Sequence, residues 1–242
     1  MSKGHNSGVT GRGNRDGPNG AYQKKDLASL RGYMKEKYGI RLASALEKMN
    51  FEITRTFAQA AERMMNEFPG LRGQIQSLEG GLRGAGVYAG ARLDGAIEMN
   101  VTRMSNMDAV ARDYALDVQR GFHPVGTDMA NIVVHEMGHQ IEAALIRQRF
   151  PGSSGNAQRA QSIAWKQSTV ARDLVSQALD QVEPGWRQSP RKAAGHIQGI
   201  SGYAGRDASE TFAEAISDAY SNGSRAKPLS RALWRLAKQA LS

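Results

Sequence analysis

Apolar side chains recur at helical spacing over much of the N-terminal third of the chain. Residues 24–38 and 41–68 both show this pattern, and Gly39 separates them. Pro69 and Gly70 end the second stretch. The apolar stripe of that second stretch consists of Leu42, Leu46, Met49, Ile53, Phe57, Ala61 and Met64 or Met65. The pattern predicts two helices, of which the second is long and continuous.

The pattern changes to short β-type runs near the middle of the chain. Residues 87–89 and 96–101 are such runs, and Asp94 and Gly95 between them form a tight-turn signal. We therefore expect a two-stranded antiparallel hairpin, with residues 74–78 as an extension of it. The strand at 96–101 is expected to form a cleft edge to which an extended peptide adds as a further strand.

Helical patterns return in the second half of the chain. Three of the expected helices span residues 109–120, 157–182 and 228–242. A further helix is capped by Thr127 or Asp128 and runs to about residue 149. Another is opened by Asp207 or Ser209 and runs to about residue 222. Residues 183–201 contain two prolines and read as a long loop, which inside a domain is often functional.

These elements predict an α+β fold, with a mainly helical domain that carries a small antiparallel sheet. Residues 1–22 are polar and glycine-rich, so they bury too little surface to offset their ordering entropy and read as a flexible, disordered tail. The expected division is a tail at 1–22, a helical region at 23–80, the main domain at 81–223 and a basic amphipathic helix at 224–242.

The net charge of +9 lies at the two ends of the 242-residue chain. Residues 1–25 contain five basic and one acidic residue, and residues 224–242 contain five basic and none acidic, so the two ends account for the whole excess. Basic ends suit contact with nucleic acid or with an anionic virion protein. The leucines of the C-terminal helix are equally consistent with docking on the chain's own core.

Composition limits the chemistry and the compartment. The chain has no cysteine, so a metal site must use His, Asp and Glu. No apolar run approaches the roughly 18–20 residues of a membrane span, and the N-terminus lacks the apolar block of a secretory signal. We therefore expect a cytoplasmic protein without membrane contact.

One helix carries a motif with specific chemistry. His135, Glu136 and His139 form H-E-x-x-H, and histidines four apart on a helix point the same way. Two such imidazoles can bind one Zn²⁺ ion, with Glu136 placed as the general base for a water that attacks a polarised carbonyl. Gly138, inside the motif, removes a side chain at a cost in helix propensity of about 1 kcal/mol.

A third ligand must come from elsewhere, because six residues after His139 stands Leu145. The helix opened by Asp207 or Ser209 carries an acidic stripe at four-residue spacing, which is made of Glu210, Glu214 and Asp218. Such a stripe is often only a solvated face, but its pairing with an H-E-x-x-H helix favours a ligand.

The order of hairpin, H-E-x-x-H helix and later Glu-bearing helix resembles the gluzincin branch of zinc metallopeptidases. Residues 201–214, with the sequence SGYAGRDASETFAE, resemble zincin-like domains of the anthrax lethal factor type. The resemblance covers about residues 81–222 and implies that Glu210 is the third zinc ligand. It also implies that Glu214 does not bind the ion but fixes an imidazole ligand by accepting its other N–H. It further implies that Tyr203 stabilises the developing oxyanion. Glu214 as the ligand in place of Glu210 stays open.

The resulting expectation is a zinc metallopeptidase that cleaves a peptide bond in a protein or peptide substrate. Similar zincin-like segments occur in bacteriophage proteins, so one alternative is a virion or assembly component. In that case the domain is structural or self-processing, and the basic ends contact nucleic acid or capsid proteins in the host cytoplasm or the particle. Another alternative is a toxin-like effector. Among the other histidines, His123 is expected to be solvated and His196 is a lesser candidate for the cleft.

Overall fold

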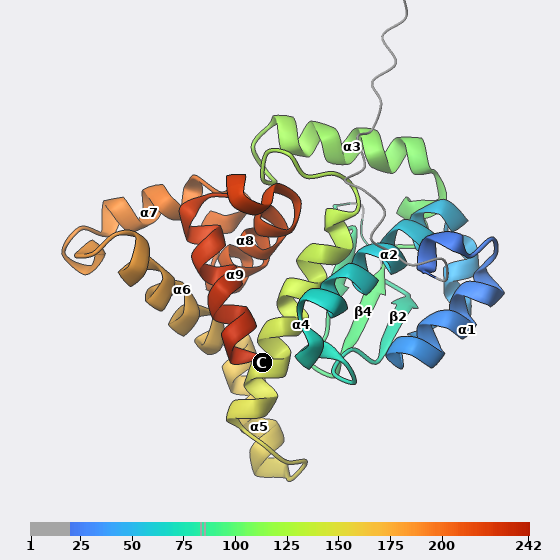
Figure 1. Ribbon diagram of the computed structural model, residues 1–242, viewed down its shortest axis with the longest axis horizontal. Coiled ribbons are helices and arrows are strands. Elements are labelled where there is room, and N and C mark those ends of the chain that lie inside the picture. Colours follow the sequence, from blue (N-terminus) through green and yellow to red (C-terminus); the bar gives the residue numbers. More distant parts are fainter. Residues whose placement is uncertain (1–19, 83, 85) are drawn as a thin grey trace, which may run out of the picture.

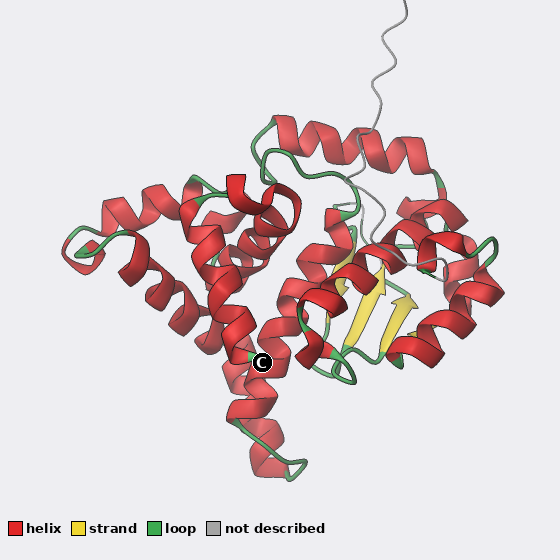
Figure 2. Cartoon of the chain, in the orientation of Figure 1, coloured by secondary structure: helices red, strands yellow, loops and turns green. Residues whose placement is uncertain are grey.

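A small sheet and the long helix α4 (Asn131–Arg149) organise the chain. The computed structural model describes residues 20–242 apart from residues 83 and 85. Helices dominate and the strands are few, as Figure 2 shows. The expected mainly helical α+β fold is therefore confirmed. Of the expected tail at residues 1–22, residues 1–19 lie outside the described residues.

Within the described residues, the sheet contains four strands in the order β1-β2-β4-β3. The strands are β1 (Arg41–Leu42), β2 (Ser77–Gly80), β3 (Ala89–Ala91) and β4 (Ala96–Met99). β3 and β4 form the predicted antiparallel hairpin, whereas β1–β2 and β2–β4 are parallel, so the sheet is mixed. The pairing of β2 with β4 joins segments on both sides of the boundary expected at residues 80 and 81.

The position of the sheet edge differs from the expectation. The run at 96–101 was expected to line a cleft edge, but β4 lies inside the sheet between β2 and β3. Among the described residues, the edge strand on the α4 side is therefore β3. Strand order depends on partners distant in sequence, which the local pattern does not record.

Helix α4 lies between two groups of elements, as Figure 1 shows. The sheet and the first two helices lie on one side of it, and the last four helices lie on the other. The other helices are α1 (Leu27–Tyr38), α2 (Phe51–Glu67), α3 (Met107–Gln119), α5 (Gly155–Lys166), α6 (Thr169–Val182), α7 (Pro190–Gln198), α8 (Ala208–Asn222) and α9 (Pro228–Ala240). The core runs through α4, so the motif helix is held from both sides.

The long helix expected at 41–68 was wrong in its first third. Residues 41–42 form β1, residues 44–48 form a 3₁₀ turn, and α2 begins only at Phe51, where the Asn50 side chain accepts the N–H of Glu52. The expected apolar positions are nevertheless buried, including Leu42, Leu46 and Met49. The same residues face the core with strand and 3₁₀ periodicity instead of helical periodicity.

Two expectations in the second half were also wrong. The helix expected at 157–182 is two helices, α5 and α6, separated by Ser168 in a left-handed conformation with φ of 50°. The loop expected at 183–201 contains α7, which starts with Pro190 in its first turn, where the missing N–H has no cost. The helix expected at 109–120 is α3, which begins two residues earlier at Met107 and is capped by Asn106. The predicted helices α8 and α9 are confirmed.

The basic C-terminal helix docks on the chain's own core. Leu229, Leu233 and Leu241 are buried, and α9 packs against α6 and α8. Of the two alternatives for its apolar stripe, internal docking is the one observed. In the described ranges 20–82, 84 and 86–242, every helix falls short of the length and apolarity that crossing a bilayer would need.

A buried carboxylate ties the start of the described chain to α2. Glu62 is 2% exposed and accepts hydrogen bonds from the backbone N–H of Ala21 at 2.9 Å, from Tyr38 Oη at 2.9 Å and from Lys37 Nζ at 3.0 Å. Tyr33 donates to it as well. Burial alone would raise the pKa of Glu62, but these donors outweigh burial and lower it.

Replacing Glu62 with Gln should lower the free energy of unfolding by about 2 kcal/mol at neutral pH, because several donors lose a charged acceptor. A carboxylate whose pKa is lowered in the folded state stabilises the fold above its unfolded pKa, and this contribution is lost as pH falls through the folded pKa. Urea unfolding from pH 7 to pH 3 should therefore show a loss below about pH 4.5 that Glu62→Gln lacks. Glu67→Gln, at an exposed position on the same helix, is the control. Equal pH profiles for wild type and Glu62→Gln would contradict the assignment.

Candidate metal centre

Helix α4 presents the H-E-x-x-H motif from a buried setting. Val134, Met137 and Ile141, which recur at helical spacing on one face, are fully buried. The expected side-chain cap from Thr127 or Asp128 was wrong. The helix begins at Asn131, and Asp128 instead accepts the N–H of Ala130 in the turn before it at 2.8 Å.

Gly138 lets α8 approach α4 closely. A Cβ atom at this position would lie 2.8 Å from Ala213 Cα and 3.2 Å from Ala213 Cβ. A distance below 3 Å to backbone is sterically excluded, so the helices cross here at a separation that only glycine allows. The packing reason for a glycine inside the motif helix is therefore this crossing.

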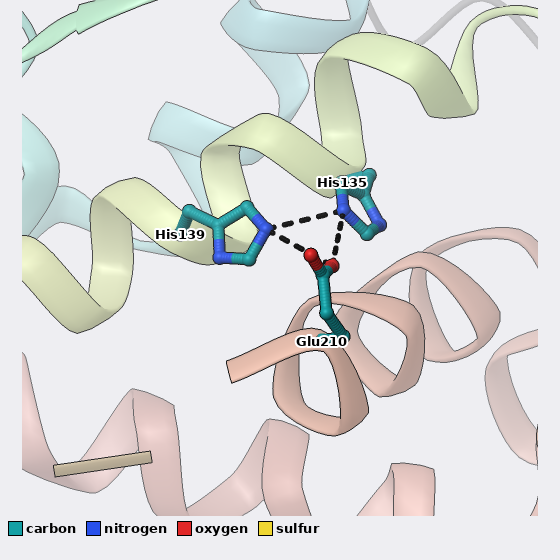
Figure 3. A group of neighbouring side chains, drawn as sticks. All are labelled: His135, His139 and Glu210. Carbon is teal, nitrogen blue, oxygen red and sulfur yellow. Dashed lines mark hydrogen bonds and ion pairs between the residues drawn. The ribbon is translucent and has the colours of Figure 1, made fainter. Parts of the chain in front are cut away.

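The crossing brings three donor atoms together. His135 Nε2 lies 3.1 Å from His139 Nε2 and 3.1 Å from Glu210 Oε2, and His139 Nε2 lies 3.4 Å from the same oxygen. Figure 3 shows the two imidazoles on α4 and the Glu210 carboxylate on the first turn of α8 pointing at one another. The Asp207 side chain, which accepts the N–H of Glu210 at 3.0 Å, fixes that first turn.

This donor set fits a zinc ion. A tetrahedral ion with bonds of about 2.0–2.1 Å separates two of its ligand atoms by about 3.3 Å, which matches the three observed separations. Oε2 of Glu210 is buried and accepts no hydrogen bond in the described part of the chain. A buried carboxylate oxygen without a hydrogen bond is costly unless a cation satisfies it. Three protein ligands leave a fourth position for water or substrate, as in catalytic zinc sites.

Glu214 lies behind His135, where it can fix the orientation of that imidazole. Its Oε1 lies 2.8 Å from His135 Nδ1 and 3.1 Å from His123 Nδ1, and Ser201 Oγ donates to its Oε2 at 2.8 Å. A carboxylate at Nδ1 favours the proton on that nitrogen and leaves the Nε2 lone pair for a metal. Glu214 therefore faces the far side of the imidazole, while Glu210 faces Nε2.

A second relay holds His139. Its Nδ1 lies 3.0 Å from Ser209 Oγ, and that hydroxyl donates to Glu142 Oε2. The hydroxyl therefore accepts from Nδ1, which again leaves Nε2 free to bind a metal. Each imidazole is therefore held by a buried carboxylate. Glu214 contacts His135 directly, and Glu142 holds His139 through Ser209.

The pKa values of these groups follow from burial and charge. Burial alone would raise the pKa of Glu214, but His123 and His135 lower it to about 2. The pKa of Glu210 is likewise lowered against its burial by the two imidazoles. For His135, burial opposes the charge, but Glu210 and Glu214 raise its pKa well above the ordinary value. The cluster thus attracts positive charge at the position where the three donor atoms meet.

Glu136 lies beside this centre in a cleft of about 300 Å³. Burial raises its pKa, which places the carboxyl closer to the range in which a general base works. The cleft is lined on one side by the β3 edge and on another by Trp165 and Ser168, at the junction of α5 and α6.

Tyr203 also lines this cleft. Its hydroxyl donates to Glu210 Oε1 at 2.9 Å and accepts from Arg206 Nη1 at 2.9 Å. Burial, followed by the charge of Glu210, raises the pKa of Tyr203, so its hydroxyl stays protonated and remains a donor. The tyrosine is thus positioned next to the expected ligand.

The structure brings together every residue predicted for the site. Two other histidines behave differently from expectation: His123 is buried and stacked on Tyr114, with ring centroids 4.7 Å apart, and His196 pairs with Glu183 outside the cleft. Sequence reasoning missed the relay of Ser209 and Glu142. The available signal was a glutamate three residues after His139, in an otherwise apolar part of the helix.

Comparison with protein-family models, with curated proteins and with solved structures gives no match to this chain.

The purified chain should bind about one zinc ion, and His135→Ala or Glu210→Ala should abolish this binding, because each removes one of three ligands. Elemental mass spectrometry after gel filtration measures the stoichiometry. His196→Ala is the matched control and should retain the ion. If Glu214→Ala lost the zinc while Glu210→Ala kept it, Glu214 would be the ligand instead.

Replacing Gly138 with Ala should reduce both stability and zinc affinity. The added methyl group would push α8 away and cost about 2 kcal/mol, although helix propensity alone would favour alanine by about 1 kcal/mol. Gly32→Ala in α1 is the control, because a Cβ there meets no atom within 4 Å. Thermal unfolding and zinc titration measure the two effects. Equal results for both variants would mean that the crossing does not constrain the site.

Proposed function

We propose that this protein is a zinc-dependent metallopeptidase that hydrolyses a peptide bond in a protein or peptide substrate. The observation that carries the proposal is the meeting of His135 Nε2, His139 Nε2 and Glu210 Oε2 beside a general-base candidate, Glu136, in an open cleft. A purely structural zinc site would be closed by a fourth protein ligand.

Zinc at these ligands supplies a Lewis acid that polarises a carbonyl and lowers the pKa of a water molecule. The chain's own residues then divide the remaining work. Glu136 accepts the proton of the attacking water and delivers it to the leaving amine. Glu214 and the Ser209–Glu142 relay keep both imidazoles aligned during the reaction.

Tyr203 has a defined part in this scheme. Its protonated hydroxyl lies next to Glu210, so a small rotation would bring it to the oxygen of the attacked carbonyl. A hydrogen bond made at that point would stabilise the developing negative charge. Arg206, which donates to the same hydroxyl, holds the ring near this position in the absence of substrate.

The β3 edge supports a peptide as the substrate. In the described part of the chain β3 pairs with β4 alone, and Ala89, Gly90 and Ala91 line the cleft. Small side chains leave their backbone accessible, and an extended peptide can pair with such an edge. This arrangement would place a substrate carbonyl alongside Glu136.

The expected cytoplasmic location and the phage or prophage origin stay predictions.

Glu136→Gln should retain zinc but lose at least about a hundredfold of the peptidase rate, because the amide cannot take a proton. The assay uses the zinc-loaded full chain with fluorescein-labelled casein and a quenched-fluorescence peptide library. Intact mass measurement over time detects self-cleavage.

Glu67→Gln, an exposed exchange of the same kind, is the control and should leave the rate unchanged. Cleavage by Glu136→Gln at the wild-type rate would contradict the mechanism. A zinc-loaded wild type that cleaves none of these substrates, nor itself, would favour the structural zincin-like domain of a virion or assembly protein.

A further inference from the structure

A second and larger hollow lies away from the metal centre, where α2, α8 and α9 meet. This groove has a volume of about 720 Å³ and shares no lining residue with the metal cleft. Its size is in the range of pockets that hold small organic ligands. None of the residues proposed for peptide hydrolysis lines it, so the proposed function does not account for it.

Three arginines line this groove: Arg63 from α2, and Arg231 and Arg235 from α9. None of them forms an ion pair with a carboxylate within the described ranges. The acidic residue of the lining, Glu67, is paired with Lys238 at 2.6 Å. The groove therefore carries an uncompensated positive charge, and such a concave basic surface attracts anions.

Two of the arginines are held in place by neutral acceptors. Arg231 Nη1 donates to the carbonyls of Ser224 at 3.0 Å and Ala226 at 2.6 Å, and Arg235 Nη2 donates to Gln181 Oε1 at 3.3 Å. These contacts orient the guanidinium groups without neutralising them. An anion would therefore meet donors that have already lost part of their conformational freedom.

Two aromatic rings stand among these charges. Tyr220 and Trp234 line the groove, and the Arg63 guanidinium carbon lies 4.4 Å from the Tyr220 ring centroid. Trp234 packs edge-on against Phe68, with centroids 4.6 Å apart, so its ring is fixed. Rings and guanidinium planes next to unpaired arginines are the features that bind nucleobases and phosphates together.

We propose that this groove binds nucleotides, with the phosphate on Arg63, Arg231 and Arg235 and the base against Trp234 or the Arg63–Tyr220 pair. The nucleotide is either a unit of a single-stranded nucleic acid or a free nucleotide, since both offer the same chemistry. An acidic peptide would satisfy the arginines but would bring no planar base to pack against the two aromatic rings. Nucleotide binding in this groove would require neither the metal ion nor peptide hydrolysis.

The test is fluorescence anisotropy of a 5′-fluorescein-labelled dT12 oligonucleotide with the full chain. Arg63→Ala/Arg235→Ala should weaken binding by about tenfold or more, and should reduce the slope of log affinity against log salt by about 1.4. Arg159→Ala/Arg191→Ala is the matched control, because it removes two exposed arginines from α5 and α7, outside the groove. Circular dichroism melting verifies that all variants fold.

Trp234→Leu tests the aromatic part and should weaken oligonucleotide binding without changing the salt slope, since it removes no charge. Competition by AMP would identify a free nucleotide as a ligand, and competition only by unlabelled dT12 would identify a strand. Either result supports the nucleotide proposal. Equal weakening by the two arginine pairs, no binding at 150 mM salt, or equal competition by a polyglutamate of matched charge would overturn it.

Discussion

The close crossing of α4 and α8 is the constraint on which the candidate metal centre depends. Gly138 and Ala213 are in contact at the crossing, and the functional side chains are placed around that contact. Glu210 precedes Ala213 by almost one turn, and Glu214 follows it directly, so a single helix position sets both carboxylates against His135. A shift of α8 would therefore move a proposed ligand and its supporting carboxylate together.

The second organising feature is the burial of several carboxylates at one place. Burial raises the pKa of Glu136 and Glu142, whereas the imidazoles lower the pKa of Glu210 and Glu214. The carboxylates that contact an imidazole therefore have lowered pKa values, and the two without such a contact have raised ones. Burying so much negative charge destabilises the fold unless a positive partner is present. A divalent cation among the three donor atoms would supply that partner.

The sequence predicted those parts of the structure that local patterns determine. The motif helix, the hairpin, α8 and α9 follow from spacing, turn chemistry and caps within a few residues of each other. The failed predictions depend on distant partners. Leu42 belongs to a strand because it pairs with Leu78, and the apolar spacing of residues 41–49 fits that arrangement as well as a helix. The break at Ser168 is a backbone conformation that serine rarely adopts, so it leaves no composition signal.

The candidate site, too, could be predicted from the sequence only in part. His135, Glu136 and His139 are fixed by spacing on one helix, and Glu210 by its place on a second helix. Glu142 stood out only as a glutamate in an apolar part of its helix, and nothing in the sequence linked it to Ser209. Their contact with each other and with His139 exists only once the two helices have crossed.

Helix α8 contributes residues to both the metal cleft and the basic groove. Glu210 in its first turn faces the metal cleft, whereas Tyr220 near its other end lines the basic groove. Ten helical residues separate these positions, which corresponds to about 15 Å along the axis and about 80° of rotation around it. The two sites share no lining residue, so a ligand in the groove would not occupy the cleft at the β3 edge. A chain held on a nucleic acid through the groove would keep its metal cleft available to a protein substrate nearby.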